Sequence, residues 1–380
     1  MKKRKIKLLS IDLGYDTVKV LTEKNKLSFP SLAQREDGGV LKNLSFDVNN
    51  FKKDSRHDKN KMIIKLRNND KTYSTFRIGD YVLNQDISTT SYSLSEDKHN
   101  KSEELAKFLA GIAMIEPSSN NIEIDKVITG LPIKFHNKYK SDFKERFEGE
   151  FKFEFIDSNE KFVSKIIKIN QVVMIPQGLA SYYDFALNDK GLVATKIQNG
   201  IGIIDLGGLT IDCVAFNDGE LIKNSPISFN FGVRKKVFEK IQNTLSIDIS
   251  QDILKEQIIR DKDFIKIRDN KYNFKKIKED TIDNLAREIS LQIENRWNDI
   301  LLIDKILITG GASIMLFDKL DKYLNNFPCE KINKNPQFSN ARGYLKLGKA
   351  LKRKKREKVK DKIKNKSKKT NKKNKKKKSS

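Results

Sequence analysis

The chain has 380 residues, of which 37% are hydrophobic, 9% aromatic and 33% charged, with a formal net charge of +26. This apolar content excludes an intrinsically disordered chain, and the length exceeds what one hydrophobic core usually fills, so we expect two globular domains. Cys213 and Cys329 match no metal or disulfide spacing and the three histidines stand apart, so neither a zinc site nor a Cys–His nucleophile is expected.

Positive charge is concentrated at the C-terminal end. Residues 352–380 contain 18 Lys or Arg against Glu357 and Asp361, which places +16 of the net +26 there. Only Val359 and Ile363 are apolar in this segment, so it cannot offset the entropy of ordering and should be disordered. Lysine runs bind polyanions by releasing counterions, and the candidates are DNA, the acidic face of a neighbouring filament and anionic lipid. The remaining alternative is a solubilising tail without a dedicated partner.

The N-terminus has a basic start followed by an apolar group, as a signal peptide does. Asp12 interrupts that apolar run too early for a secretory signal. No segment reaches the roughly 18 continuous apolar residues of a transmembrane helix. We therefore expect a cytoplasmic protein without a transmembrane segment.

The predicted elements alternate between strands and helices, which indicates mixed α/β domains. Residues 6–22 should form two strands about a turn at Gly14, and residues 35–75 resemble a loop-rich insertion. The strand–turn–strand pattern returns at 201–216, which suggests a duplicated domain. The other expected elements, in chain order, are ordered structure at 76–83, a helix at 102–115, a strand at 124–132, a strand and helix at 172–187, helices at 231–242 and 278–300, a strand, Gly-Gly turn and helix at 305–320, and a helix at 341–351.

Both strand pairs carry polar residues where a buried strand would continue with Val or Ile: DLGYDTVK at 12–19 and DLGGLTID at 205–212. Glycine lets backbone N–H groups approach a phosphate without interference from a Cβ. An aspartate can face phosphate when a cation lies between them, and Mg²⁺ is commonly held by one or two carboxylates plus phosphate oxygens. The pattern predicts a Mg²⁺–nucleoside triphosphate clamped between two domains, with Asp12 and Asp205 at the hydrated metal and Lys19 directed at the β- and γ-phosphates.

A single Asp-Leu-Gly after a strand is usually only a hairpin turn. Here there are two, and a third glycine signal, ITGGAS at 308–313, follows an apolar strand and opens a helix, as a ribose or adenine platform would. The combination favours nucleotide binding. Gly232 is either a further nucleotide contact or an N-cap glycine, and Asp212 is either close to the metal or an acid at a strand end.

These motifs, taken in order with IPQGLASYY at 175–183, resemble the phosphate 1, connect 1, phosphate 2 and adenosine motifs of the actin, Hsp70 and sugar kinase superfamily. The resemblance runs through residues 6–351. Within the superfamily the chain looks most like bacterial and archaeal actin-like proteins of the ParM type, through FPSLAQ at 29–34, FRIGDYVL at 76–83 and ITGLPIKFHNKYK at 128–140.

The resemblance implies an α/β actin-like fold: two duplicated RNase H-like domains around a nucleotide cleft, with a disordered basic C-terminal tail. Domain I would be residues 1–190, completed by 333–351, and domain II residues 191–332. The tail would be residues 352–380.

It also implies roles for single residues. Asp12 and Asp205 would be the Mg²⁺-associated acids and, with Gln177, the catalytic set. Gln177 occupies the connect 1 position that orients the attacking water in actin, where ParM-type proteins usually have Glu; an amide cannot accept the proton of that water, so slow turnover is expected. The implied nucleotide contacts are Gly14, Tyr15, Thr17, Lys19, Gly207, Gly208, Thr210, Gly232, Gly310, Gly311 and Ala312.

The implied function is an ATPase that binds ATP, or GTP, with Mg²⁺, forms homopolymeric filaments and couples hydrolysis to their disassembly. Such filaments segregate plasmid DNA through an adaptor protein bound to a centromere-like site, and the basic tail would contact DNA or neighbouring filaments. The alternatives are a non-polymerising small-molecule kinase, for which no motif supplies a carboxylate base, and an Hsp70-like ATPase, for which no β-rich substrate domain follows residue 351.

Overall fold

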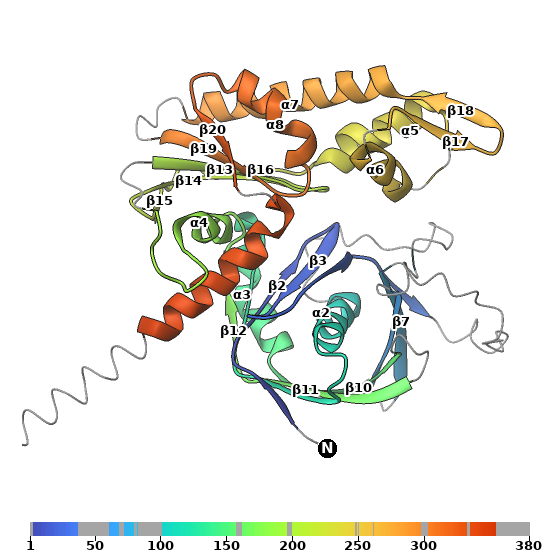
Figure 1. The fold of residues 1–380 in the computed structure, drawn as a ribbon, viewed down its shortest axis with the longest axis vertical. Coiled ribbons are helices and arrows are strands. Elements are labelled where there is room, and N and C mark those ends of the chain that lie inside the picture. Colours follow the sequence, from blue (N-terminus) through green and yellow to red (C-terminus); the bar gives the residue numbers. More distant parts are fainter. Residues whose placement is uncertain are drawn as a thin grey trace, which may run out of the picture.

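The structure is a computed structural model that describes residues 3–36, 61–67, 72–79, 82, 101–156, 162–195, 200–247, 249, 251–260, 262–297, 303–332 and 335–354. Two halves, each built on β-sheet, are joined by two helices that pass between them (Figure 1). Among the described helices, none combines the length and apolar character that crossing a bilayer requires.

A five-stranded sheet carries the first of the two predicted strand pairs. Its order is β12 (Val172–Met174), β9 (Val127–Thr129), β2 (Leu9–Leu13), β3 (Thr17–Leu21) and β4 (Lys26–Pro30). Strands β2 and β3 are antiparallel with Asp12 opposite Lys19, while β2, β9 and β12 run parallel. The two strands expected within residues 6–22 are confirmed.

A seven-stranded sheet completes the first half. Its order is β1 (Arg4–Ile6), β8 (Asn121–Ile124), β11 (Phe162–Ile169), β10 (Gly149–Ile156), β6 (Lys61–Arg67), β7 (Tyr73–Gly79) and β5 (Ala33–Glu36). The strand expected at 124–132 is present as β9, followed by Gly130, Leu131 and Pro132 outside any strand, but it begins later than expected, because Ile124 still belongs to β8 in the other sheet. Strand β6 falls within the supposed loop-rich insertion: its buried Met62, Ile63 and Ile64 join the sheet despite polar neighbours. Residues 37–60 lie outside the described ones.

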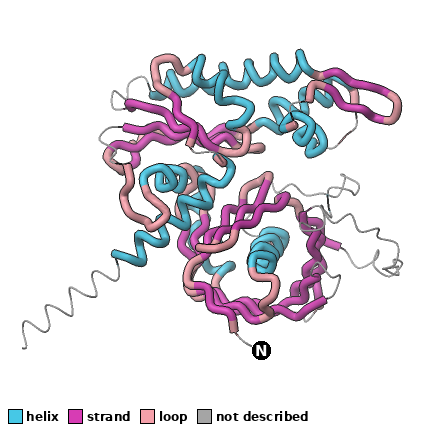
Figure 2. The backbone as a smooth tube through the Cα atoms, in the orientation of Figure 1, coloured by secondary structure: helices cyan, strands magenta, loops and turns pink. Residues whose placement is uncertain are grey.

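Helix α2 (Ser102–Ile115) lies inside the ring formed by these two sheets and contacts strands of both (Figures 1 and 2). It coincides with the expected helix at 102–115. Its Phe108 meets the edge of Phe147 at the end of α3 (Ile133–Phe147), with ring centroids 4.6 Å apart. Burying a mostly apolar helix between two sheets gives this half its single large core.

The second half repeats the strand arrangement of the five-stranded sheet. Its order is β15 (Glu220–Leu221), β14 (Ile211–Asn217), β13 (Gly200–Leu206), β19 (Ile303–Thr309) and β20 (Cys329–Lys331), with β16 (Ile227–Phe229) also on β14. Strands β13 and β14 are antiparallel, as β2 and β3 are. Strands β13, β19 and β20 run parallel, as β2, β9 and β12 do. The duplication expected from the sequence is therefore present in the topology.

Helices cover the outer face of the second sheet (Figure 1). They are η5 (Arg234–Phe238), a π-helix that continues as α5 (Glu239–Leu245), α6 (Gln251–Ile259), α7 (Lys275–Trp297) and α8 (Ser313–Tyr323). The expected helix at 231–242 is thus a π-helix over its first turn. The apolar stripe of α7, which includes Trp297, is buried, and the indole of Trp297 donates to the Ser225 carbonyl at 2.8 Å. A hairpin of β17 (Phe264–Ile267) and β18 (Asn270–Asn273) lies beside them.

The two linking helices are α4 (Leu179–Ala186) and a helix at residues 339–354, which follows the 3₁₀ turn η6 (Pro336–Phe338). They cross tightly, since a Cβ on Gly343 would overlap the Ala180 carbonyl. Asp184 of α4, which is buried, pairs with Arg342 at 2.7 Å and Lys346 at 2.8 Å. The ion pairs and the close crossing fix the two helices to each other.

The packing of the two linking helices can be compared with the predicted domain boundaries. Tyr182 and Ala186 of α4 pack on Ile201 and Phe216 of the second sheet, although the predicted boundary at residue 190 assigns α4 to the first domain. Tyr344 of the last helix packs with Leu8 and Ile128 of the first half. Residues 352–354, expected in the tail, continue this helix, and residues 355–380 lie outside the described ones.

Candidate functional site

A cavity of about 260 Å³ opens between the two halves, where the two repeated hairpins face each other. Its lining comes from both hairpins, from the Gly-Gly turn after β19 and from the linking segments. The predicted site residues that line it are Asp12, Gly14, Tyr15, Thr17, Lys19, Gln177, Asp205, Gly207, Gly208, Thr210, Gly310, Gly311 and Ala312. Four separate stretches of the sequence are therefore brought to one cavity.

The first hairpin joins β2 to β3 in a tight turn. A Cβ on Gly14 would lie 2.7 Å from the Thr17 carbonyl oxygen and 3.0 Å from Lys19 Nζ, so only glycine fits. Lys19 Nζ lies 3.1 Å from Asp12 Oδ2, across the strand pair, and both side chains are largely buried. Asp12 thus lines the cavity and is paired with the Lys19 ammonium group of the same hairpin.

The second hairpin has the same strand pairing but a different pair of charges across it. Asp205 faces Asp212 in the register in which Asp12 faces Lys19. The Gly207 amide donates to the Thr210 carbonyl at 3.0 Å and closes the turn. Two buried acids therefore stand side by side where the first hairpin has an ion pair.

Burial raises the pKa of both acids. Burial, together with the nearby Asp12 and Asp212 charges, raises the pKa of Asp205 to about 7 despite a hydrogen bond from Asn340. Burial raises the pKa of Asp212 to about 6, against hydrogen bonds from Ser228 and Thr210. A divalent cation next to Asp205 would supply the charge that the second hairpin lacks.

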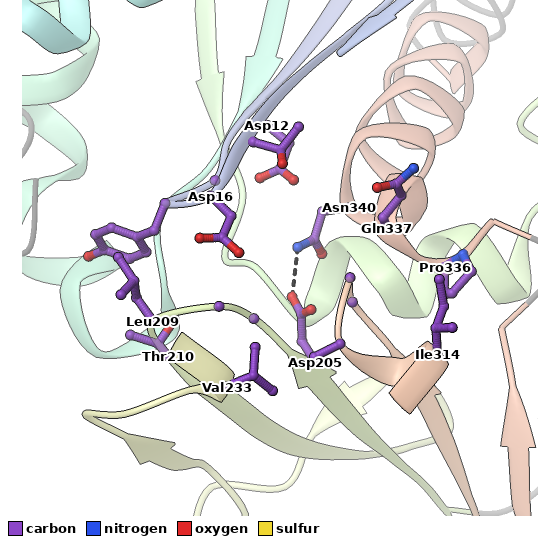
Figure 3. Close-up of a pocket in the computed structure, with 18 of the residues that line it drawn as sticks. Asp12, Asp16, Asp205, Leu209, Thr210, Val233, Ile314, Pro336, Gln337 and Asn340 are labelled. Atoms are coloured by element: carbon purple, nitrogen blue, oxygen red, sulfur yellow. Dashed lines mark hydrogen bonds between the residues drawn. The ribbon is translucent and has the colours of Figure 1, made fainter. Parts of the chain in front are cut away.

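Two amide side chains hold the two aspartates that face the cavity. Gln177, just before α4, donates from Nε2 to Asp12 Oδ1 at 3.3 Å. Asn340 on the last helix donates from Nδ2 to Asp205 Oδ2 at 2.7 Å, the hydrogen bond drawn in Figure 3. Asn340 also accepts from Ser181 of α4 at 2.9 Å. Each linking segment therefore contributes an amide to one of the aspartates.

The Gly-Gly turn after β19 lies against the second hairpin. Gly310 has a φ of +90°, which favours glycine, and a Cβ there would crowd the Leu206 amide and the Asp205 carboxylate. The Ala312 amide donates to the Leu206 carbonyl at 3.0 Å. Beyond the turn, Ile314 on α8 is 61% exposed although it lines the cavity, so this end offers an apolar side chain to a ring.

Gly232 is the one predicted contact that is not among the cavity-lining residues. A Cβ on Gly232 would lie 2.5 Å from the Gly208 carbonyl oxygen and 2.6 Å from that of Gly207. The Arg234 amide donates to the same Gly208 carbonyl at 2.9 Å. Gly232 thus packs against the backbone of the second hairpin, which is neither the nucleotide contact nor the N-cap role considered for it.

Four polar residues of the cavity were missed from the sequence: Asp16, Lys255, Gln337 and Asn340. Asp16 lies within the first hairpin motif, where its negative charge among residues predicted to contact phosphate was a visible signal. Lys255 on α6 and Asn340 on the last helix carried no local signal, because only the folded chain brings them to the cavity. Figure 3 shows Asp12 and Asp16 entering from one side and Asp205 from the other.

The donor set fits a hydrated Mg²⁺ better than a metal enclosed by protein ligands. In the part of the chain that the structure describes, no group of three or more His, Cys, Asp or Glu side chains could hold a metal ion. Mg²⁺ usually keeps several waters and takes one or two carboxylates plus phosphate oxygens. Asp12 and Asp205, on opposite sides of the cavity, provide two such carboxylates.

Solved structures resemble this fold across nearly its whole length, whereas no curated protein sequence matches the chain. A 15-stranded ParM filament from Clostridium botulinum superposes with a TM-score of 0.72 at 22% identity, covering 92% of this chain and 99% of that one. Actin-like protein Alp7A gives 0.72 at 17% identity, covering 94% and 99%. Bacillus thuringiensis ParM with AMPPNP gives 0.67 at 17% identity, covering 92% and 99%.

Two family models match the sequence itself. Residues 10–179 match the N-terminal domain of actin-like proteins, and residues 203–322 match the C-terminal domain of the archaeal, MreB-like actin homologue. The matches divide the chain between its two halves, and each contains one of the hairpins. The architecture is the predicted two-domain actin-like fold, and the chain belongs to the actin-like proteins.

Proposed function

We propose that this protein is a filament-forming ATPase of the ParM type that segregates plasmid DNA in the cytoplasm. The observation that carries the proposal is the convergence of two glycine hairpins, with Asp12 and Asp205 on opposite sides, on one cavity between the halves. A ligand held by both hairpins would couple its own binding to closure of the two halves.

ATP with Mg²⁺ is the proposed ligand, and GTP is the alternative. The turns at Gly14, Gly207 and Gly208 would let the phosphates approach the backbone, although the Gly207 amide is itself engaged by the Thr210 carbonyl. The adenosine would lie against Gly310 and Gly311 near the exposed Ile314. When bound, Mg²⁺ would neutralise phosphate charge and Asp205 together. Tyr15, Thr17, Thr210 and Ala312 complete the proposed contacts.

Gln177 would orient the attacking water. It lies 3.3 Å from Asp12, and therefore beside a proposed Mg²⁺-associated acid. An amide positions water through hydrogen bonds but does not remove its proton, so hydrolysis by the isolated subunit should be slow. Slow hydrolysis would allow a filament to assemble before it is weakened.

Polymerisation is supported by the similar structures, and DNA segregation is inferred from the resemblance to ParM-type proteins. A ParM filament from Clostridium botulinum and Alp7A share the fold across nearly the whole chain. The proposed partners are further copies of this chain and an adaptor protein bound to a centromere-like DNA site. The lysine-rich segment that ends at residue 380 would contact DNA or neighbouring filaments.

Light scattering and pelleting with Mg-ATP, Mg-ADP or no nucleotide test this proposal. We expect polymer with Mg-ATP, followed by disassembly as phosphate is released. Nucleotide turnover without any polymer would instead favour the small-molecule kinase or the Hsp70-like ATPase. A chain lacking residues 355–380 should still polymerise but lose bundling or DNA binding.

A further inference from the structure

The turn of the first hairpin contains an acid that faces the second hairpin. Asp16 lies between β2 and β3, and its carboxylate reaches the backbone of Gly208, where any side chain would overlap it. In Figure 3 this carboxylate enters the cavity between the two hairpins. The space between the glycine turns thus already holds a negative group that belongs to the protein.

Two cations of the second half hold this carboxylate. Arg234, in the π-helix η5, donates from Nε to Asp16 Oδ1, and Lys255 Nζ of α6 lies 3.5 Å from Oδ2. The Arg234 side chain is only 4% exposed, Asp16 17% and Lys255 28%. The ion pairs are therefore largely shielded from water and connect the two halves across the cavity.

The charges around Asp16 resemble a site made for an anion. Burial alone would raise the pKa of Asp16, but the charges of Lys255 and Arg234 outweigh it and lower the pKa, so the group is a carboxylate at neutral pH. A guanidinium, an ammonium and glycine backbone together suit a phosphate better than a carboxylate, because phosphate carries more charge and more acceptor oxygens.

We propose that Asp16 is a tethered anion that occupies a phosphate position between the hairpins, and that a polyphosphate displaces it and takes over Arg234 and Lys255. This inference rests on the proposed nucleotide site and adds two cations to it. A phosphate cannot share the position with the carboxylate, because two anions in contact repel each other strongly in a shielded site. Asp16 therefore lowers the affinity for nucleotide in the natural protein.

The ion pairs have a second consequence for the unliganded protein. Asp16 moves with the first half, whereas Arg234 and Lys255 move with the second, so their pairing holds the cavity closed before a ligand arrives. Displacement of Asp16 by phosphate exchanges this internal contact for a contact through the ligand. Nucleotide-dependent rearrangement would then begin at Asp16.

Calorimetric titration of Asp16→Asn with ATP and with inorganic tripolyphosphate, each in Mg²⁺ and in EDTA, tests this proposal. Removing the competing charge should tighten binding of both ligands about tenfold, since a hydrogen-bonded charge is commonly worth roughly 1.4 kcal/mol or more. The gain should be largest in EDTA, where no metal shares the phosphate charge. Unchanged or weaker binding of tripolyphosphate would overturn the proposal.

Asp283→Asn is the matched control. Asp283 on α7 also pairs with two cations, Lys319 at 3.0 Å and Arg287 at 3.3 Å, but it does not line the cavity. The Asp283→Asn substitution removes the same charge as Asp16→Asn and should leave the affinities for ATP and for tripolyphosphate unchanged. Asp16→Gly is a second variant if the asparagine form does not fold, with the same expected gain.

Lys255→Gln tests whether the gain in affinity from Asp16→Asn arises from competition for Lys255. With this cation removed, ligand affinity should fall, and adding Asp16→Asn should give less than the tenfold gain seen in the natural background. Equal gains in the two backgrounds would contradict competition for Lys255.

The two ligands separate this inference from the proposed function. If tripolyphosphate binds and responds to Asp16→Asn while ATP does not bind, the phosphate position is supported and the ATPase is not. If ATP binds and is indifferent to Asp16→Asn, the ATPase stands and the tethered anion is overturned. If neither ligand binds any of the variants, both proposals fail.

Discussion

Hairpins 12–19 and 205–212 occupy equivalent places in two sheets of the same topology, yet they present different charges to the cavity. Asp12 is opposite Lys19 and forms an ion pair at 3.1 Å, while Asp205 is opposite a second acid, Asp212. Each of the two aspartates accepts a hydrogen bond from a side-chain amide, Asp12 from Gln177 and Asp205 from Asn340. The two hairpins share the backbone arrangement, but the leading acid of the first has a cation opposite it, whereas the leading acid of the second has another acid opposite it.

The difference assigns separate tasks to the two hairpins. The first carries its own cation and can meet phosphate oxygens directly through Lys19. The second holds Asp205 with its pKa raised to about 7, a state that a bound cation would reverse by stabilising the carboxylate. Each prediction below alters one member of this comparison.

Asp205→Ala should have the largest effect, because it removes the acid that most needs a metal. We expect Mg²⁺-dependent ATP hydrolysis to fall roughly 1,000-fold, as loss of metal-assisted charge stabilisation costs several kcal/mol. Phosphate release at saturating Mg-ATP measures it, with circular dichroism as the check on folding. Unaltered hydrolysis and Mg-ATP uptake would contradict the whole site assignment.

Gln177→Ala should lower turnover about 100-fold while nucleotide affinity stays within a few-fold, because positioning of water matters only in the chemical step. Single-turnover hydrolysis and calorimetry separate the two quantities. Asn340→Ala, which removes the matching amide on the other aspartate, is the natural comparison. A loss of affinity without a loss of turnover would show that Gln177 does not orient water.

Lys19→Met should weaken ATP binding about tenfold by removing one charge-assisted contact to phosphate. ATP should lose more affinity than ADP if Lys19 reaches the terminal phosphates. Calorimetric titration with both nucleotides measures this ratio. Equal losses for ATP and ADP would place Lys19 away from the terminal phosphate.

Asp212→Asn should have the smallest effect, on stability without ligand. The pKa of Asp212 is raised to about 6 in the folded state, so the folded protein takes up a proton that the unfolded chain does not hold between about pH 4 and pH 6. The unfolding free energy of the natural protein therefore falls as pH rises through this window, and the cost of the buried charge is fully present above it.

The amide that Asp212→Asn introduces carries no such charge. In EDTA at pH 8 the variant should be more stable than the natural protein by about 1 kcal/mol, and the advantage should vanish near pH 4. Urea unfolding at both pH values measures it. An advantage that persists unchanged at pH 4 would mean that packing, not the charge of Asp212, is responsible.

Much of the fold could be predicted from local patterns in the sequence. Strand–turn–strand motifs at 6–22 and 201–216, the α2 helix and the apolar stripe of α7 depend on contacts between near neighbours in sequence, which a local pattern records. The glycines at 14, 207 and 310 are needed by backbone geometry within a few residues. Their positions could therefore be assigned from the sequence.

Other features depend on residues far apart in the chain. Strand β6 lies in a stretch of sequence rich in polar residues, and it forms a strand because β7 and β10 pair with it. Residues 124–132 divide between two sheets, which no local pattern records. The π-helix η5 likewise begins at a contact distant in sequence, where the Arg234 amide donates to the Gly208 carbonyl.

The sequence by itself determined the fold class, the duplicated hairpins and most of the residues that line the cavity, because glycine turns and their flanking acids form within single hairpins. Only the tertiary structure decided which charges meet: Asp16 with Arg234 and Lys255, and Asp205 with Asn340. These partners lie 135 to 239 positions apart in the sequence. Electrostatic interactions act through space, so the charge balance of the site is fixed when the two halves come together.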